Sequence, residues 1–373
     1  MLDSTKRRER DDGKTFLSCG NSMLPRVPLA FNGARKLDVG SHQRAWCSTE
    51  QTDRRIRSDA TGTRSAMTAP TAHTDHERLV LGRLRRQLVA GHGRGRGEAY
   101  KAWLRVRRRS SSRVSHPILS HLPLAMRSYH LLSKEEENAS LVLSWLGAKE
   151  IREGLPAWPI DHPHPAIGWD ASSEKSLGWV PGLLDIAKSA GIYHGDIAGT
   201  RIPYIATIDI VAILPPMPSN RLLFIGCKPT KFLLEDERAI ERLELERRYA
   251  RSCGGRHRIV HEATFDAQLV ENLRCYAPRY DTLTRVESMP QFLEFCAEFV
   301  RISADRPVVV ARDQCARLFG VLEDAELMLR AGIWLREIDA DLSKPIVRAS
   351  PLVCDHGRVA RSLVSSLMGD EDE

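Results

Sequence analysis

The sequence lacks a long apolar run, a paired cysteine motif and an apolar stretch near its start. No window approaches the roughly 18–20 uninterrupted apolar residues that a membrane-spanning helix needs. The charges of the first ten residues are followed by no apolar segment, so we expect no secretory signal. The eight cysteines are scattered without a C-x-x-C pair, and a zinc site is therefore not expected. These absences predict a cytoplasmic protein that works without a membrane.

The chain has an ordinary globular composition and an uneven distribution of charge. Its 373 residues, 42% apolar and 28% charged, are enough for two average domains. Residues 1–120 hold 25 Lys and Arg against 11 Asp and Glu, whereas the remaining residues hold 30 against 37. A basic front half favours a polyanionic partner, because Lys and Arg release counterions from nucleic acid. A basic tail without any ligand is the alternative.

Residues 1–75 show weak periodicity and many small polar residues, which predicts a disordered segment or an upstream extension of the reading frame. Met67 would then be an alternative start. Leucines spaced among arginines predict a short basic helix from His76 to Ala90. The run Gly91–Gly97 follows. Because no strand precedes this run, it does not match a dinucleotide-binding fingerprint, and we expect a flexible basic loop.

Arginines of this loop and of the stretch after it are the candidate contacts to DNA phosphates. Five more arginines lie from Arg105 to Arg113, close to the Gly-Arg repeat. A solvated charged edge is the simpler interpretation, but the two basic segments together favour a phosphate-contacting surface. The predicted contacts are Arg94, Arg96, Arg105, Arg107, Arg108 and Arg109.

A helix is predicted over residues 134–147, with Ser133 as its N-cap and Glu136 at the capping-box position. Glu136 lies one turn upstream of the buried stripe. An acid there is usually only a cap or a favourable contact with the helix dipole. The stripe follows the i, i+3, i+4, i+7 pattern through Ala139, Val142, Leu143 and Leu146.

The segment 204–228 predicts two adjacent strands. The first is apolar on both faces except for Asp209, and a proline-rich turn follows it. The second strand ends with Gly226 and Lys228 on one face. The order helix–strand–strand–helix–strand is completed by a helix and a short strand at about residues 234–251 and 258–260.

A carboxylate inside an apolar strand is costly unless it is paired or bound to a metal ion. Lys228 could simply be the ion-pair partner of Asp209. A functional interpretation competes with this one, because an Asp, a hairpin and then a Lys, with a helical Glu upstream, is the layout of a metal-dependent nuclease site. Divalent cations neutralise the phosphate and generate hydroxide, acids hold the cations, and a lysine orients the water or stabilises negative charge.

Short motifs in a constant order carry a resemblance to a known family. Read alone, the last of these motifs, residues 236–249, is an exposed helix with pairs such as Arg242–Glu246 and Glu244–Arg248. The motifs are a Gly-rich loop, Tyr100-x-x-Trp103-Leu104-x-Val106, Ser115-His116, Ser120-His121, His130-Leu-Leu-Ser133, Trp145, Ile151-Arg-Glu153, Thr207-Ile-Asp209, Ile225-x-x-Lys-Pro229 and Asp236-Glu-Arg-x-x-Glu-x-Leu-Glu-Leu-Glu-Arg-Arg-Tyr249. Over residues 78–278 the chain closely resembles TnsA, the endonuclease subunit of heteromeric cut-and-paste (TnsABC-type) transposases.

The resemblance implies an α/β fold whose catalytic domain, residues 76–278, is a PD-(D/E)XK core like that of type II restriction endonucleases. It implies catalytic roles for Glu136, Asp209 and Lys228. The implied cofactor is Mg²⁺, which Mn²⁺ can replace, held by Glu136, Asp209 and the backbone carbonyl of Cys227.

Two residues depart from the family pattern. The family normally has Gln two residues before the lysine, where this chain has Gly226, so one side-chain ligand is missing. The family also has Gln after Arg-Glu, where this chain has Gly154. The first departure favours altered metal binding, or a chain that no longer cuts.

The resemblance also implies partners. In that family the subunit nicks the 5′ strands of double-stranded DNA at transposon ends, so that transposition is cut-and-paste. A DDE-type transposase subunit (TnsB-like) cuts and joins the 3′ ends, and an AAA+ ATPase regulator (TnsC-like) binds the C-terminal domain. The implied place of action is the cytoplasm, in association with the nucleoid.

Residues 279–373 would form a winged-helix-like domain that binds these partners. Helices at about residues 290–301 and 314–330 and a short hairpin over 333–347 are expected there. A small helical cap on the nuclease is the alternative.

Two other functions compete with an active endonuclease. Gly226 supports a catalytically degenerate DNA-binding and assembly subunit of the transposase complex. A stand-alone restriction or repair nuclease is the third hypothesis, and the partner-like C-terminal segment argues against it.

Overall fold

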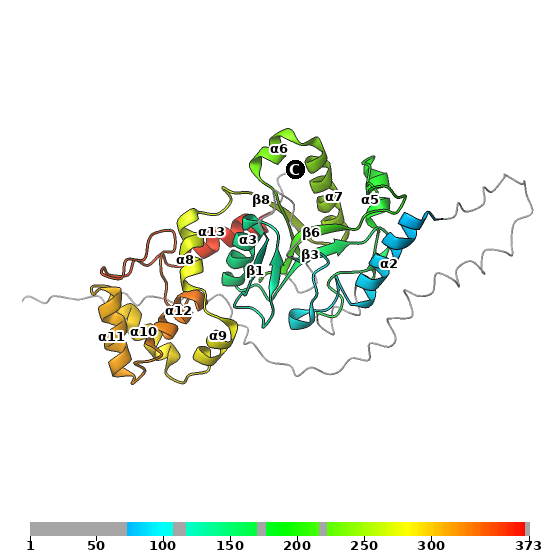
Figure 1. Ribbon diagram of the computed structural model, residues 1–373. Helices are drawn as coiled ribbons and strands as arrows, with labels where there is room; N and C mark the ends of the chain where they lie inside the picture. Colours follow the sequence, from blue (N-terminus) through cyan, green and yellow to red (C-terminus); the bar gives the residue numbers. More distant parts are fainter. Residues whose placement is uncertain (1–72, 107–116, 170–176, 216–221, 370–373) are drawn as a thin grey trace, which may run out of the picture. The chain divides into compact units, whose positions relative to one another are not determined.

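A four-stranded sheet lies at the centre of the computed structural model, which describes residues 73–106, 117–169, 177–215 and 222–369 (Figure 1). Its strands are antiparallel except for the last pair, which runs parallel because two helices cross between its members. In spatial order the strands are β3 (Glu150–Ala157), β6 (Ala206–Ile213), β7 (Leu223–Cys227) and β8 (Arg256–Val260). The segment expected to be disordered lies outside the described residues as far as residue 72, and so do Arg107, Arg108 and Arg109.

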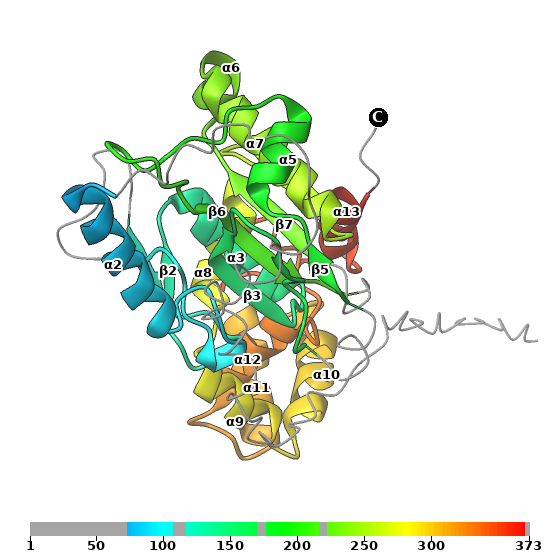
Figure 2. The same ribbon diagram turned by 90° about the vertical axis from the view of Figure 1, so that its right-hand side faces the viewer.

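Alternating side chains of β6 supply the two faces of the sheet with separate cores. Ile210 and Ala212 join a core that includes side chains of α3 (Lys134–Trp145) and α8 (Ala267–Tyr276). Val211 and Ile213 join a second core, with α5 (Leu183–Ala190) and α7 (Glu237–Ser252). Figure 2 shows α5 and α7 lying over the sheet. The predicted strand around Asp209 is therefore confirmed, and both of its faces are covered.

Shorter elements frame this sheet. The predicted basic helix is α2 (Asp75–Val89), which begins at a capping box formed by Thr74 and Glu77. A 3₁₀ turn (Gly97–Ala99) follows the glycine-rich loop. The remaining short strands pair as two small antiparallel sheets, β1 (Ile118–Ser120) with β2 (Tyr129–Leu131) and β4 (His162–Pro163) with β5 (Trp179–Val180).

Strand β3 is the main addition to the predicted order of elements. Its sequence carries Glu150, Arg152 and Glu153, which do not read as a buried strand, yet all three side chains are buried. Glu150 pairs with Arg96 and Glu153 with Arg127, so each charge has a partner elsewhere in the chain. The predicted helix over residues 234–251 is divided into α6 (Thr230–Glu235) and α7, because Asp236 caps the second helix by accepting the Ala239 N–H.

The C-terminal segment is helical, as expected, but its details differ. The predicted helix over 290–301 is found as α10 (Phe292–Ser303), whereas the one over 314–330 is wrong, because Gly320 turns the chain with a φ of 66° between α11 (Val308–Leu318) and α12 (Ala325–Leu335). The expected hairpin over 333–347 is also wrong, because α12 continues to Leu335 and no strand follows Val260 among the described residues. The helices are α9 (Tyr280–Glu287), α10 (Phe292–Ser303), α11 (Val308–Leu318), α12 (Ala325–Leu335) and α13 (Arg358–Met368).

One core connects the sheet with these helices. The core that contains Ile210 and α3 continues without interruption through α10 and α12 to Leu367 on α13. In Figure 1, helices α9 to α12 gather beside α8 at one end. No helix of the described part of the chain is long and apolar enough to cross a membrane.

Candidate active site

Asp209 and Lys228 come together where β6 and β7 meet. The Lys228 ammonium lies 3.0 Å from Asp209 Oδ2, and the same oxygen accepts the backbone N–H of Cys227 at 2.7 Å. Both side chains keep an exposed part, 20% for Asp209 and 24% for Lys228. Lys228 also donates to the carbonyl of Cys227 at 2.9 Å. The predicted pairing of these two residues is therefore present, and the carbonyl proposed as a metal ligand faces the lysine.

Glu136 stands at the start of α3 and is only 6% exposed. Ser133 caps the helix, since its hydroxyl oxygen accepts the Glu136 N–H at 3.1 Å. The carboxylate of Glu136 accepts the N–H of Leu132 at 2.9 Å, one residue earlier than a capping box would use. Glu136 is thus buried at the head of the helix with one backbone donor.

The charges of these groups act on one another. Burial, and after it the negative charge of Asp209, together raise the pKa of Glu136 to about 8. Burial alone would lower the pKa of Lys228, but the charge of Asp209 and its hydrogen bond outweigh that effect and leave the pKa raised. The positive charge of Lys228 lowers the pKa of Glu136 and so opposes part of this rise. The three predicted residues therefore form one electrostatic group, with the ammonium as its only cation among them.

Two glycines stand beside Asp209 in the sheet. The register of β3 on β6 pairs Glu153 with Ile210 and Leu155 with Ile208, which places Gly154 opposite Asp209. Gly154 has a φ of 54°, which a residue with a side chain adopts only at a cost. The register of β7 on β6 pairs Ile225 with Ile210, and its next step places Gly226 on the other side of Asp209. The two departures from the family pattern thus flank the same carboxylate.

Two buried residues near Gly226 were missed by the sequence reasoning. A side chain at position 226 would meet Glu246 Oε2 of α7 at 2.8 Å and His257 Nε2 of β8 at 3.4 Å. The predicted surface pair Arg242–Glu246 is wrong, because Glu246 turns inward while Arg242 lies over the ring of Tyr204. The helical phase could have shown this, because Glu246 falls on the stripe of Ala239, Leu243 and Ala250, which are all buried.

Oxygen donors dominate this group of residues, as magnesium and manganese require. Glu136, Asp209 and the Cys227 carbonyl supply them, and Glu246 Oε2 is a buried oxygen with no hydrogen-bond partner. Among the described residues, however, no three His, Cys, Asp or Glu side chains are grouped closely enough to hold a metal ion by themselves. The donors fit a hard divalent cation in their chemistry, and Lys228 contacts two of them, Asp209 and the Cys227 carbonyl.

The predicted DNA-contacting arginines do not share one environment. Arg96 points into the protein, where it pairs with Glu150 and donates to the carbonyls of Pro165 and Ile167 at 2.9 Å and 2.7 Å. Arg105 is exposed and donates to His130 Nε2 at 3.3 Å. Arg94 is half-buried beside a bridge to Lys101. Of the three predicted arginines that the structure describes, Arg105 and Arg94 are therefore better placed for a phosphate than Arg96.

A buried ion pair holds the β2–β3 side of the site. Arg127 makes two bonds of 2.8 Å to Glu153, one to each carboxylate oxygen, and its guanidinium lies 3.6 Å from the centre of the Tyr129 ring. The hydroxyl of Tyr100 donates to the carbonyl of Glu153. Tyr100 and Glu153, which belong to the motifs behind the resemblance, are thus structural supports here, and Arg127 joins them.

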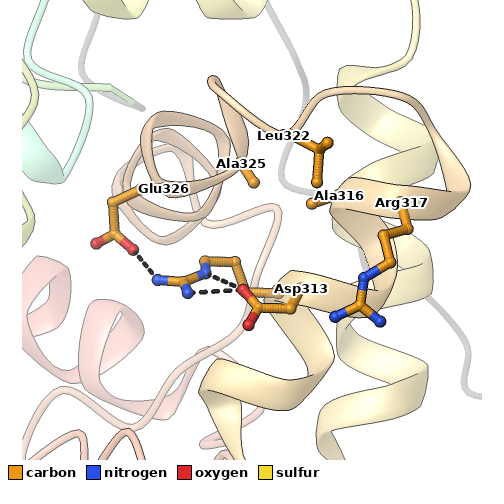
Figure 3. A pocket seen from close by; sticks show the side chains of 7 residues that line it. Asp313, Ala316, Arg317, Leu322, Ala325 and Glu326 are labelled. Atoms are coloured by element: carbon orange, nitrogen blue, oxygen red, sulfur yellow. Dashed lines mark hydrogen bonds and ion pairs between the residues drawn. The ribbon is translucent and has the colours of Figure 1, made fainter.

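A separate pocket lies in the helical segment. It measures about 420 Å³ and is lined from α11 and α12 by residues that include Arg312, Asp313 and Glu326 (Figure 3). Its charges pair with one another, because Arg312 contacts Asp313 at 2.6 Å and Glu326 at 2.8 Å. None of the predicted catalytic residues lines this pocket.

Comparison with known proteins bears on the resemblance directly. No protein-family model matches the chain. A stretch of 165 residues is 33% identical to the transposon Tn7 transposition protein TnsA of Escherichia coli. The resemblance to TnsA is confirmed. The matched stretch covers 44% of this chain and 50% of that TnsA, so the chain spans about half the length of the relative that it matches. The likeness therefore concerns a part of each protein.

Proposed function

We propose that this chain is a metal-dependent DNA endonuclease that works as a subunit of a heteromeric transposase. It nicks the 5′ strands at transposon ends, so that transposition is cut-and-paste. The observation that carries the proposal is the meeting of Asp209 with Lys228 at 3.0 Å, on the two strands where a nuclease needs them. The similarity to a transposition protein supports the same function.

Each residue of the site has a role in this chemistry. Glu136, Asp209 and the Cys227 carbonyl hold Mg²⁺ or Mn²⁺ in a PD-(D/E)XK core. The bound cation supplies neutralisation of the phosphate charge and a water of lowered pKa. Lys228, a protonated ammonium at neutral pH whose pKa the charge of Asp209 raises further, orients the attacking water or stabilises the developing charge.

The proposal includes a division of labour with partners. A DDE-type transposase subunit acts on the 3′ ends, and an AAA+ ATPase regulator binds this chain through the helices after residue 278. Arg94 and Arg105 contact the phosphates of the double-stranded DNA at the transposon ends. The complex acts on DNA at the nucleoid.

The decisive experiment maps cuts on both strands of an end-bearing DNA. The protein is combined with its cognate transposase subunit, the ATPase regulator and Mg²⁺. We expect Asp209→Asn to abolish the 5′-strand nick, and Lys228→Gln to slow it by about 10²–10³-fold, as loss of one stabilising donor does. Asp185→Asn, which changes an exposed aspartate on α5, is the matched control and should cut normally. Retained cutting by Asp209→Asn would overturn the assignment.

A catalytically degenerate assembly subunit is the second candidate, and Gly226 favours it. Because β7 offers no side chain beside Asp209, the strand contributes one ligand fewer than the family pattern. In that case the same mapping would show 3′-strand cuts alone, made by the partner, with wild type and Asp209→Asn indistinguishable.

A further inference from the structure

The buried carboxylate of Glu246 is the strongest feature that the proposed site leaves unexplained. Its side chain is 12% exposed, and Oε2 has no hydrogen-bond partner in the described structure. The nearest polar contact of that oxygen is His257 Nε2 at 3.5 Å, too long for a good hydrogen bond. His257 is itself only 4% exposed, and its Nε2 has no hydrogen-bond partner among the described residues. Glu246 Oε2 and His257 Nε2 thus face each other across one place as a loose ion pair, and neither atom has a hydrogen bond among the described residues.

That place is where a side chain on β7 would stand. A Cβ at Gly226 would lie 2.8 Å from Glu246 Oε2 and 2.7 Å from Leu243 Cδ2, so α7 fills the space that the glycine leaves. The β6–β7 register puts Gly226 beside Asp209. The carboxylate of Glu246 on α7 therefore occupies the space where a side chain at position 226 of β7 would otherwise lie.

Electrostatics connect Glu246 with the site. The charge of Asp209 acts on Glu246 as well as on Glu136, and Lys228 opposes its effect at both. Burial raises the pKa of Glu246. One lysine ammonium, that of Lys228, is shared electrostatically by Glu136, Asp209 and Glu246, whose side chains are not grouped as a ready-made metal site among the described residues, and a buried oxygen without a donor is costly to maintain. A bound divalent cation would add positive charge near these carboxylates and would coordinate the oxygen that has no donor.

We propose that Glu246 supplies, from α7, the metal-ligating carboxylate that position 226 on β7 lacks, with His257 holding it in place. The inference rests on the proposed endonuclease function and names a further ligand for the same site. On this inference, Gly226 does not remove a metal ligand from the site, because Glu246 on the neighbouring helix supplies the carboxylate that the strand lacks.

The test measures Mn²⁺ binding to the full chain by isothermal titration calorimetry. Glu246→Gln keeps the size of the side chain and removes its charge, and its fold is checked by thermal unfolding without added metal. We expect Mn²⁺ affinity to fall at least about 10-fold, the lower end of what outer-shell changes alone cause. Glu244→Gln on the same helix removes an identical charge that pairs with Arg247 and Arg248, and should bind like wild type.

Cleavage gives an independent second readout. The Mn²⁺ concentration for half-maximal 5′ nicking should rise by a similar factor in Glu246→Gln and stay unchanged in Glu244→Gln. If Glu246→Gln has wild-type Mn²⁺ affinity and a wild-type Mn²⁺ requirement, the inference about Glu246 is overturned. If Asp209→Asn in the same series does not cut, the proposed endonuclease function still stands. If Asp209→Asn also cuts and binds Mn²⁺ normally, the proposed function itself fails.

A relocation variant separates a ligand from a structural support. Glu246→Ala should lose Mn²⁺ affinity, and adding Gly226→Glu should restore part of it, because the Cβ then meets the flexible end of Leu243 and, at 3.4 Å, His257 Nε2. Glu246 acting merely as a brace between α7 and His257 of β8 would not be rescued by a carboxylate on β7. Equal affinities of the single and double variants, with both folded, would count against the proposal.

Discussion

At the scale of single residues, burial decides what a charged side chain can do. Arg96 and Arg105 are only nine positions apart, but Arg96 is 19% exposed on its side chain and pairs with the buried Glu150, whereas Arg105 lies on the surface. An exposed arginine retains its full attraction for phosphate. A buried one is held by its partner, and removing it leaves an uncompensated charge.

This difference predicts opposite effects for two arginine substitutions. Arg96→Ala should lower the free energy of unfolding by about 1–3 kcal/mol, because the buried Glu150 loses its closest cation and keeps only Arg152, whose Nε lies 3.6 Å away. Arg105→Ala should leave stability unchanged and reduce the slope of log affinity for DNA against log salt by about 1. Urea denaturation and DNA binding at several salt concentrations measure the two effects. Arg301→Ala, an exposed change on α10, should alter neither DNA binding nor its salt dependence, and an unchanged slope for Arg105→Ala would exclude it as a phosphate contact.

At the scale of elements, one acid links α2 to a distant loop. Glu77 closes the capping box of the helix and accepts the backbone N–H of Arg201 at 3.0 Å from a distant loop. Hydrogen bonds from Arg201, and one from Thr74, lower the pKa of Glu77 to about 2. The charged form of this residue is therefore favoured by folding.

A pH dependence of stability follows from that shift. The usual pKa of this carboxyl is 4.5 and the folded value is lower, so the stabilisation is complete above pH 4.5 and is lost as the pH falls toward 2. We expect Glu77→Gln to be less stable than wild type at pH 6, with the difference narrowing steadily below pH 4.5. The difference is measured from the urea midpoints of wild type and Glu77→Gln between pH 6 and pH 2. Asp75→Asn, on the same turn of the helix, is the control. A constant difference down to pH 2 would contradict the linkage.

At the scale of the whole molecule, the sheet and the C-terminal helices share one core. The hydrophobic cluster includes Ile210 of β6, Phe295 of α10 and Leu367 of α13. Polar contacts cross the same region, since Arg274 of α8 pairs with Glu137 of α3 at 2.9 Å and Arg336 donates to the Trp145 carbonyl. The boundary predicted between residues 278 and 279 passes through this shared core.

We therefore expect sheet and helices to unfold together. Urea transitions followed by tryptophan fluorescence and by far-ultraviolet circular dichroism should coincide, and a chain ending at residue 278 should lose its cooperative transition, because the core face under α10 and α12 would be exposed to water. Two separate transitions in the full chain would show that the segments are independent domains.

Much of the candidate site could be predicted because its signals are local. Asp209 is conspicuous as the one charge in an apolar strand, Lys228 follows from the period of the next strand, and Ser133 marks the start of the helix that carries Glu136. Strand β3 could not be predicted in the same way, since its buried charges look like a surface until Arg96 and Arg127 are known to pair with them.

The sequence by itself determined the two central strands and the capped helix, because periods of 2 and 3.6 residues are properties of neighbouring positions. The catalytic roles predicted for Glu136, Asp209 and Lys228 came from the resemblance and stay predictions. Only the tertiary structure decided that Arg96 turns inward, that Glu246 leaves the surface for the space beside Gly226, and that no hairpin forms over residues 333–347. Those outcomes depend on which faces are covered and which charges meet across long stretches of chain. Local patterns can show which face of a helix or strand is apolar, but not which element covers that face or which distant charge it meets.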